Sequence, residues 1–170
     1  MKTLAITFLV FLHTVLVAQK NIQSSNSFTI EGAVKKSLTV TLDSIRHHKA
    51  VSIDSVGIKN HLGERKSSLE NITVIPLKIF LDQVEFVVES PKQLSEFYLV
   101  LEATDGYKVV FSWNEIFNNP LGETVYIVCS RDGKNIENLD NRIAVFSKTD
   151  QMTGRRYVKG LQKITVKRVE

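Results

Sequence analysis

Apolar and polar residues alternate along several short stretches of this chain. The pattern predicts β-strands, because successive side chains of a strand point to opposite faces. The alternation is clearest at Phe28–Gly32, Lys49–Val56 and Tyr157–Val169. Shorter β-prone runs predict further strands, which begin at Leu38, Ile72, Phe86, Thr124 and Arg142. Strands therefore make up most of the expected structure.

The centre of the chain carries a hairpin signal followed by a helix signal. Two β-prone runs, Tyr98–Glu102 and Tyr107–Phe111, flank Asp105-Gly106, a pair that favours a tight turn because glycine tolerates a positive φ. Ser112 and Glu115 then fit a capping box, in which the hydroxyl accepts from a free backbone N–H and the carboxylate reaches back to the cap. A short helix is therefore predicted directly after the hairpin.

Other short helices and one long loop complete the predicted architecture. Thr41 is a candidate N-cap for a helix over residues 42–48, and Pro76 can begin another helix. Residues 58–70 are polar and without periodicity, which predicts a long loop. Strands interrupted by two or three short helices indicate the α+β class, with a mainly antiparallel or mixed sheet.

The first residues are typical of a secretory signal peptide. Lys2 precedes a mostly apolar run over residues 3–18, which is shorter than the roughly 20 residues that span a bilayer. We therefore predict a signal peptide over residues 1–18, a flexible polar lead-in over 19–27 and one domain over 28–170. The product is expected to be exported, periplasmic or secreted, with no membrane span after cleavage. Its one cysteine, Cys129, has no partner for an intramolecular disulfide.

The charge of the chain is mild. There are 22 Lys and Arg residues against 18 Asp and Glu, a formal net charge of +4. Removal of the leader takes away one lysine, and charges of both signs are interspersed along the rest. A nucleic-acid-binding protein would carry a basic stripe, so the composition argues against that class.

Four sequence blocks cover nearly all of the chain after the leader. They are Phe28–Val34 with Leu38–Val40, then Thr73–Leu81, then Ala103–Ser112 with Glu115, and a tail made of Arg142–Val145, Gly154–Lys159 and Ile164–Val166. Taken in order, these blocks resemble the molybdopterin-binding domain of the sulfite oxidase family. The resemblance implies a fold of the same type. It also implies a molybdenum ion held by the dithiolene of a pterin cofactor and by a cysteine thiolate.

The position of that cysteine departs from the pattern of the family. The matching stretch is Ser52–Gly57, which places Ser55 where the family has its thiolate ligand. A thiolate donates strongly to molybdenum, whereas an unperturbed serine hydroxyl stays protonated and is a poor ligand. Two interpretations remain open: Ser55 is an oxygen ligand of the metal, or it is a solvated serine at the end of a strand.

Basic residues in the tail are the candidates for binding the cofactor. The resemblance matches Lys159 to a lysine near the pterin phosphate and Arg142 to an arginine of the same tail, while Arg155 and Arg156 lie just before Lys159. Such cations, together with backbone N–H groups near Gly154, favour an anion. Molybdopterin or another small anionic ligand is the implied occupant.

Structural interpretations compete with these assignments. Lys159, Lys163 and Lys167 alternate with apolar residues, as lysines on the solvated face of an edge strand do. In the central hairpin, Asp105 and Tyr107 could be site residues, although turn geometry also accounts for Asp105 and packing for Tyr107.

Three functions follow from these observations. The first is an exported, non-catalytic binding module that has lost the metal-ligating thiol and binds a pterin-like or other anionic ligand, or an envelope protein partner. The second is an active molybdopterin-dependent oxidoreductase with an atypical metal ligand. The third is a structural envelope protein.

Overall fold

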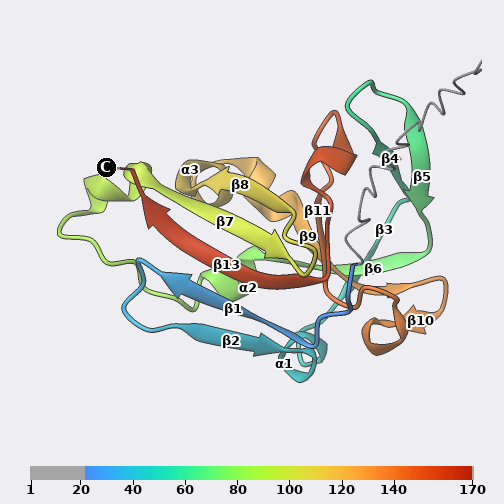
Figure 1. Ribbon diagram of the computed structural model, residues 1–170, viewed down its shortest axis with the longest axis horizontal. Helices are drawn as coiled ribbons and strands as arrows, with labels where there is room; N and C mark the ends of the chain where they lie inside the picture. Colours follow the sequence, from blue (N-terminus) through green and yellow to red (C-terminus); the bar gives the residue numbers. More distant parts are fainter. Residues whose placement is uncertain (1–21, 170) are drawn as a thin grey trace, which may run out of the picture.

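The computed structural model describes residues 22–169, so the predicted leader and residues 19–21 lie outside the described residues (Figure 1). The strands in the described range are β1 (Ser27–Gly32), β2 (Leu38–Thr41), β3 (Val51–Ile53), β4 (Val56–Lys59), β5 (Arg65–Leu69), β6 (Ile72–Pro76), β7 (Phe97–Ala103), β8 (Lys108–Ser112), β9 (Val125–Arg131), β10 (Lys134–Asn135), β11 (Ala144–Ser147), β12 (Val158–Lys159) and β13 (Leu161–Arg168). The α-helices are α1 (Leu42–Arg46), α2 (Lys78–Leu81) and α3 (Trp113–Phe117). The 3₁₀ helices are η1 (Pro91–Glu96), η2 (Pro120–Thr124), η3 (Ile136–Asn138) and η4 (Thr153–Arg156).

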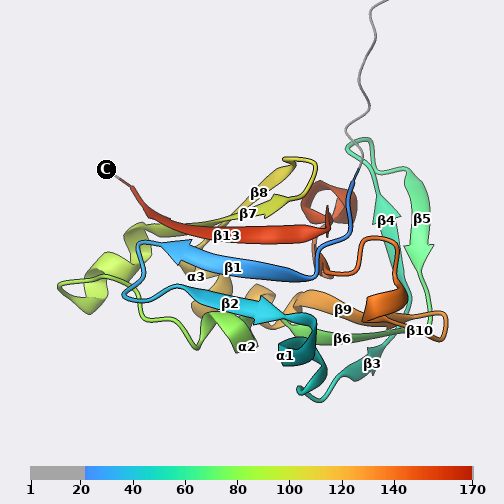
Figure 2. The same ribbon diagram turned by 60° about the horizontal axis from the view of Figure 1, so that its bottom comes forward.

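Two large sheets form the body of the molecule. The five-stranded sheet has the order β2-β1-β13-β7-β8, and the six-stranded sheet has the order β12-β11-β9-β6-β3, with β10 paired to β9. The pair β1 and β13 is parallel, and the other pairs within these sheets are antiparallel. Figure 2 shows β1, β2 and β13 as a layer above β6 and β9. The predicted α+β class with a mixed sheet and short helices is confirmed.

The main hydrophobic core contains the inward-facing residues of both large sheets. The five-stranded sheet contributes Phe28, Ile30, Leu99, Phe111 and Ile164, and the six-stranded sheet contributes Ile75, Ile127, Val145 and Val158. Phe80 and Leu81 of α2 belong to the same cluster. Burial of each such side chain contributes roughly 1.5–3 kcal/mol relative to exposure, so the alternation in the sequence holds the two sheets together.

A separate two-stranded hairpin, β4–β5, replaces the long loop predicted over residues 58–70. Val56 pairs with Leu69, and Ile58 pairs with Ser67. Val56, Ile58 and Leu69 are buried in a second apolar cluster with residues of the six-stranded sheet such as Phe146. The loop prediction was wrong because most side chains of this hairpin face solvent, which leaves little periodicity to read.

The final strand predicted over Tyr157–Val169 is divided at Gly160, so that β12 joins one large sheet and β13 the other. Gly160 has a φ of +68°, and a Cβ there would lie 2.5 Å from the carbonyl oxygen of Gln23. Because β13 lies between β1 and β7, the edge-strand interpretation of Lys163 and Lys167 is wrong. Neither lysine is buried, as the alternation predicts.

Both predicted caps are present. Thr41 caps α1, and the Ser112 hydroxyl accepts from the Glu115 N–H at 3.1 Å while the Ser112 N–H donates to Glu115 Oε2 at 2.7 Å. The strand predicted at Phe86 is absent, and that residue makes only an isolated bridge with Val34. None of the helices in the described part of the chain is long and apolar enough to cross a membrane.

The described part of the predicted lead-in is attached to the domain. Ser25 is 5% exposed and makes a parallel bridge with Arg142. The Gln23 N–H donates to the Thr104 hydroxyl at 3.1 Å, and this hydroxyl in turn donates to the Gln23 carbonyl oxygen at 2.7 Å. Flexibility was predicted from polar composition, but a polar segment can be ordered by backbone hydrogen bonds to strands remote in sequence.

Candidate functional site

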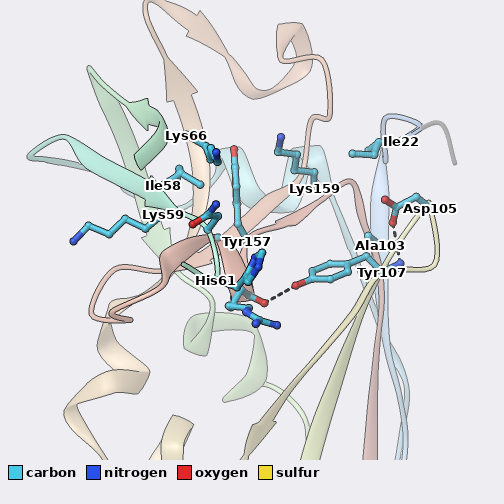
Figure 3. Close-up of a pocket in the computed structure, with 13 residues that line it drawn as sticks. Ile22, Ile58, Lys59, His61, Lys66, Ala103, Asp105, Tyr107, Tyr157 and Lys159 are labelled. Atoms are coloured by element: carbon cyan, nitrogen blue, oxygen red, sulfur yellow. Dashed lines mark hydrogen bonds between the residues drawn. The ribbon is translucent and has the colours of Figure 1, made fainter. Parts of the chain in front are cut away.

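A cleft of about 450 Å³ lies where three segments meet, as Figure 3 shows. The segments are the β4–β5 hairpin, the turn between β7 and β8, and the stretch from η4 to β12. The charged and aromatic residues that line it include Lys59, Lys66, Tyr107, Arg155, Tyr157 and Lys159.

The central turn brings Tyr107 to the cleft. The Asp105 carboxylate accepts from the Tyr107 N–H at 2.8 Å, and the Ala103 N–H donates to the Tyr107 carbonyl oxygen at 2.9 Å. Gly106 has a φ of +81°, which the Asp-Gly pair supplies at low cost. The predicted turn therefore forms, and it places Asp105 and Tyr107 in the cleft lining.

The β4–β5 hairpin is held against η4 by one threonine and one glycine. The Thr153 hydroxyl accepts from the Lys59 N–H at 2.9 Å and donates to the Gly57 carbonyl oxygen at 2.6 Å. The next residue, Gly154, approaches the same strand so closely that a Cβ would lie 2.6 Å from the Lys59 carbonyl oxygen. These contacts fix one wall of the cleft relative to another.

A hydrogen bond joins the other two segments of the cleft. The Tyr107 hydroxyl donates to the carbonyl oxygen of Arg155 at 2.5 Å (Figure 3). Tyr107 belongs to the β7–β8 turn and Arg155 to η4, and the two are 48 positions apart in the sequence. The bond therefore fixes the position of η4 relative to the five-stranded sheet.

The lining carries more positive than negative charge. Asp105 is the one carboxylate in the lining, and one of its oxygens accepts the hydrogen bond from the Tyr107 N–H within the turn. Lys66 forms an ion pair with Glu64 at 2.7 Å, and the Lys159 ammonium lies 5.2 Å from the centre of the Tyr157 ring. Burial raises the pKa of the Tyr157 phenol, so that this group stays neutral beside the lysines.

Two of the predicted basic residues, Arg155 and Lys159, come together in this cleft. Within residues 22–169 neither of these two side chains forms an ion pair with a carboxylate. Lys59 also belongs to the lining, but its side chain points away from Tyr107 and Lys159 (Figure 3). Cations without a carboxylate partner are available to an anion from solution.

Arg156 does not line the cleft. Its guanidinium donates to both oxygens of Asp150, at 2.7 Å and 2.5 Å, and to Glu115 at 2.8 Å, and it lies 4.2 Å above the ring of Phe111. The hydrogen bonds to Asp150, followed by those to Glu115, outweigh burial and raise the pKa of Arg156. This arginine therefore connects η4 to α3 and β8 within the fold.

The two remaining candidates lie elsewhere. Arg142 has a φ of +50° and lines a smaller cavity of about 30 Å³, which shares Tyr157 with the cleft. Ser55 is exposed in the connection between β3 and β4 and does not line the cleft. The structure thus does not bring Ser55 into the same cavity as Arg155 and Lys159, and its role as a metal ligand stays a prediction.

The residues that line the cleft offer no thiol to the metal of the implied cofactor. Within residues 22–169, no group of three or more His, Cys, Asp or Glu side chains is placed to hold a metal ion. The only thiol, that of Cys129, is half-buried on β9, and burial raises its pKa to about 11. In the absence of a metal this thiol is therefore protonated near neutral pH, and Cys129 does not line the cleft.

Several cleft residues were missed from the sequence. Lys59 and Lys66 belong to the stretch interpreted as a loop, Tyr107 was assigned to packing, and Tyr157 was assigned to no site. Residues 58–70 contain three Lys or Arg residues and two Glu residues, so their composition gave only a weak signal for Lys59 and Lys66. Their meeting with Arg155 depends on contacts between segments remote in sequence.

Comparisons with known proteins identify the fold but not a family. The structure matches that of the sulfane dehydrogenase SoxCD from Paracoccus pantotrophus with a TM-score of 0.55 and 13% sequence identity. The match covers 85% of this chain and 39% of that chain, so the protein spans well under half of its structural neighbour. No protein-family model and no curated protein matches the sequence. The likeness supports a fold related to that of the domain that the sequence resembles.

Proposed function

We propose that this protein is an exported, non-catalytic binding module of the sulfite-oxidase molybdopterin-domain type, whose basic cleft takes a small anionic ligand. A pterin that carries a phosphate is one ligand of this class. The observation behind the proposal is that Arg155 and Lys159 line one cleft and have no carboxylate partner among the described residues.

The size and lining of the cleft suit such a ligand. Small-molecule sites commonly measure about 300–1,000 Å³ and combine apolar walls with a few convergent polar groups. Here Ile58 and Ala103 supply apolar surface, while Tyr107 and Tyr157 offer aromatic rings next to the cations. An anionic group would be held by charge-assisted hydrogen bonds, which are stronger than neutral ones.

The non-catalytic part of the proposal rests on donor chemistry. Redox catalysis of the family type uses a thiolate on molybdenum, whereas neither Cys129 nor Ser55 lines the cleft. The residues that line the cleft can bind and orient an anion. They include no cysteine and only one carboxylate, Asp105.

A second function, that of a molybdopterin-dependent oxidoreductase, is favoured by the likeness of the fold to a sulfane dehydrogenase. Metal analysis separates the two. Protein purified from a host that makes the molybdenum cofactor is expected to contain no molybdenum. Stoichiometric molybdenum would establish the second function and overturn the first.

Anion binding is tested by titrating the mature protein with inorganic pyrophosphate in a calorimeter at low salt. Lys159→Ala is expected to weaken binding about tenfold, because a charge-assisted hydrogen bond contributes roughly 1.5 kcal/mol. Lys167→Ala is the matched control, since it removes the same charge from β13 outside the cleft. An equal effect of the two variants would show a diffuse electrostatic attraction and no site.

Export is tested by expressing the full chain in a bacterium and fractionating the cells. Periplasmic protein whose N-terminal sequence begins at Gln19 would support the predicted leader. Uncleaved protein in the cytoplasm would contradict this part of the proposal and leave the cleft unaffected.

A further inference from the structure

The role of Tyr107 in the cleft is not explained by packing. The residue is 40% exposed, so much of its surface is open to solvent. Its hydroxyl nevertheless makes a hydrogen bond of 2.5 Å to the carbonyl oxygen of Arg155. A phenylalanine would fill the same space but could not form this hydrogen bond, so the hydroxyl adds a contact that the ring alone does not make.

This bond completes the attachment of the Arg155 backbone. The Arg155 N–H donates to the Met152 carbonyl oxygen at 2.8 Å, and the Arg155 carbonyl oxygen accepts from Tyr107. On the N-terminal side, Gly154 is packed against β4. The backbone of Arg155 is therefore attached to the β7–β8 turn through Tyr107, while the residue lines the cleft without an ion-pair partner among the described residues.

We propose that Tyr107 is a positioning residue that holds Arg155 so that its guanidinium binds one oxyanion group of the ligand with two hydrogen bonds. A guanidinium presents its N–H groups as a planar fork, and this fork matches a carboxylate or phosphate only in a narrow range of orientations. A fixed backbone restricts those orientations and so lowers the entropy lost on binding. The inference rests on the proposed anion-binding function and adds the group that selects the ligand.

The bond has a second consequence for the ligand. It connects the β7–β8 turn to η4, and residues of both segments line the cleft. The turn itself is held by the Asp105 carboxylate and by Gly106, so Tyr107 reaches Arg155 from a rigid base. Loss of the hydroxyl would free η4 at Arg155 while the turn stays in place.

The test is a double-mutant cycle between Tyr107→Phe and Arg155→Ala, measured with the mature protein and inorganic pyrophosphate. Tyr107→Phe is expected to weaken binding about fivefold, the effect of one hydrogen bond. In the Arg155→Ala background the same change is expected to weaken binding less than twofold, because no guanidinium remains to be positioned. Tyr98→Phe is the matched control, since it removes a hydroxyl from β7 outside the cleft lining.

The outcomes separate the positioning role of Tyr107 from the proposed anion-binding function. Unchanged binding by Tyr107→Phe, or an equal loss with and without the Arg155 side chain, would overturn the positioning role and leave the anion site intact. No binding by the wild-type protein would overturn both. Should Tyr107→Phe fold poorly, Arg155→Lys tests the same geometry, because it keeps the charge and lacks the fork. This variant is expected to bind at least fivefold more weakly, and wild-type affinity would contradict the proposal.

Discussion

Arg155 and Arg156 are adjacent in the sequence, yet the structure gives them opposite environments, and this leads to a sharp prediction. Arg156 makes three hydrogen bonds to Asp150 and Glu115 and lies over Phe111, whereas Arg155 lines the cleft. Replacement of Arg156 by alanine should therefore reduce stability and leave binding unchanged in the folded protein. Replacement of Arg155 should do the reverse.

The magnitude follows from the contacts that Arg156→Ala removes. Its side chain is 20% exposed and that of Asp150 is 11% exposed, so the change leaves a largely buried carboxylate without its cation. Breaking a fully buried pair costs about 3–5 kcal/mol, and partial exposure to water lowers this to about 2–3 kcal/mol. For a domain of this size, that loss corresponds to a fall in Tm of about 5–10 °C.

The assay is urea unfolding followed by pyrophosphate titration of each variant well below its midpoint. We expect Arg156→Ala to lose about 2–3 kcal/mol in the free energy of unfolding and to bind pyrophosphate within twofold of wild type. Arg155→Ala, the matched control, should change stability by less than about 0.5 kcal/mol and weaken binding about tenfold. Wild-type stability of Arg156→Ala combined with loss of binding would refute this reasoning, because it would place Arg156 in the ligand site.

Three further predictions concern pH, packing and the thiol. Burial alone would raise the pKa of Glu115, but hydrogen bonds from Ser112 and Arg156 outweigh it and lower this pKa below 4.5. The stabilisation by the ionised Glu115 carboxylate is therefore present above pH 4.5 and is lost as the pH falls through the lower pKa of the folded state. Glu115→Gln lacks this titrating group, so its Tm should fall less steeply than that of the wild type between pH 6 and pH 3. An identical slope would contradict this. Gly154→Ala places a Cβ 2.6 Å from the Lys59 carbonyl oxygen. The free energy of unfolding in urea should therefore fall by about 1–3 kcal/mol, and pyrophosphate should bind more weakly. If neither the stability nor the affinity changed, η4 would be free to move away from β4. Cys129, with a pKa of about 11, should react with a thiol reagent at pH 8 far more slowly in the native state than in urea. Equal rates would show that the fold does not protect this thiol from the reagent.

Signals contained in a few consecutive residues were sufficient for much of the local structure. The turn at Asp105-Gly106, the N-cap at Thr41 and the capping box at Ser112 form as predicted, because their hydrogen bonds join residues two to three positions apart. The alternation of apolar residues likewise places the core faces of the strands, since a strand buries every second side chain. The α+β class follows from these elements.

The tertiary structure decided what local signals leave open. It divided the final strand at Gly160 between two sheets, and it paired residues 58–70 into a hairpin in which Ile58 and Leu69 are buried. It also places Arg155 in the cleft lining and Arg156 in an ion-pair network. The difference arises because Asp150, Glu115 and Phe111 all contact Arg156. The physical reason is that a cleft is made of surfaces from segments far apart in the chain. The sequence gives the chemical type of each side chain, whereas the residues that surround it in space are determined only when the sheets pack.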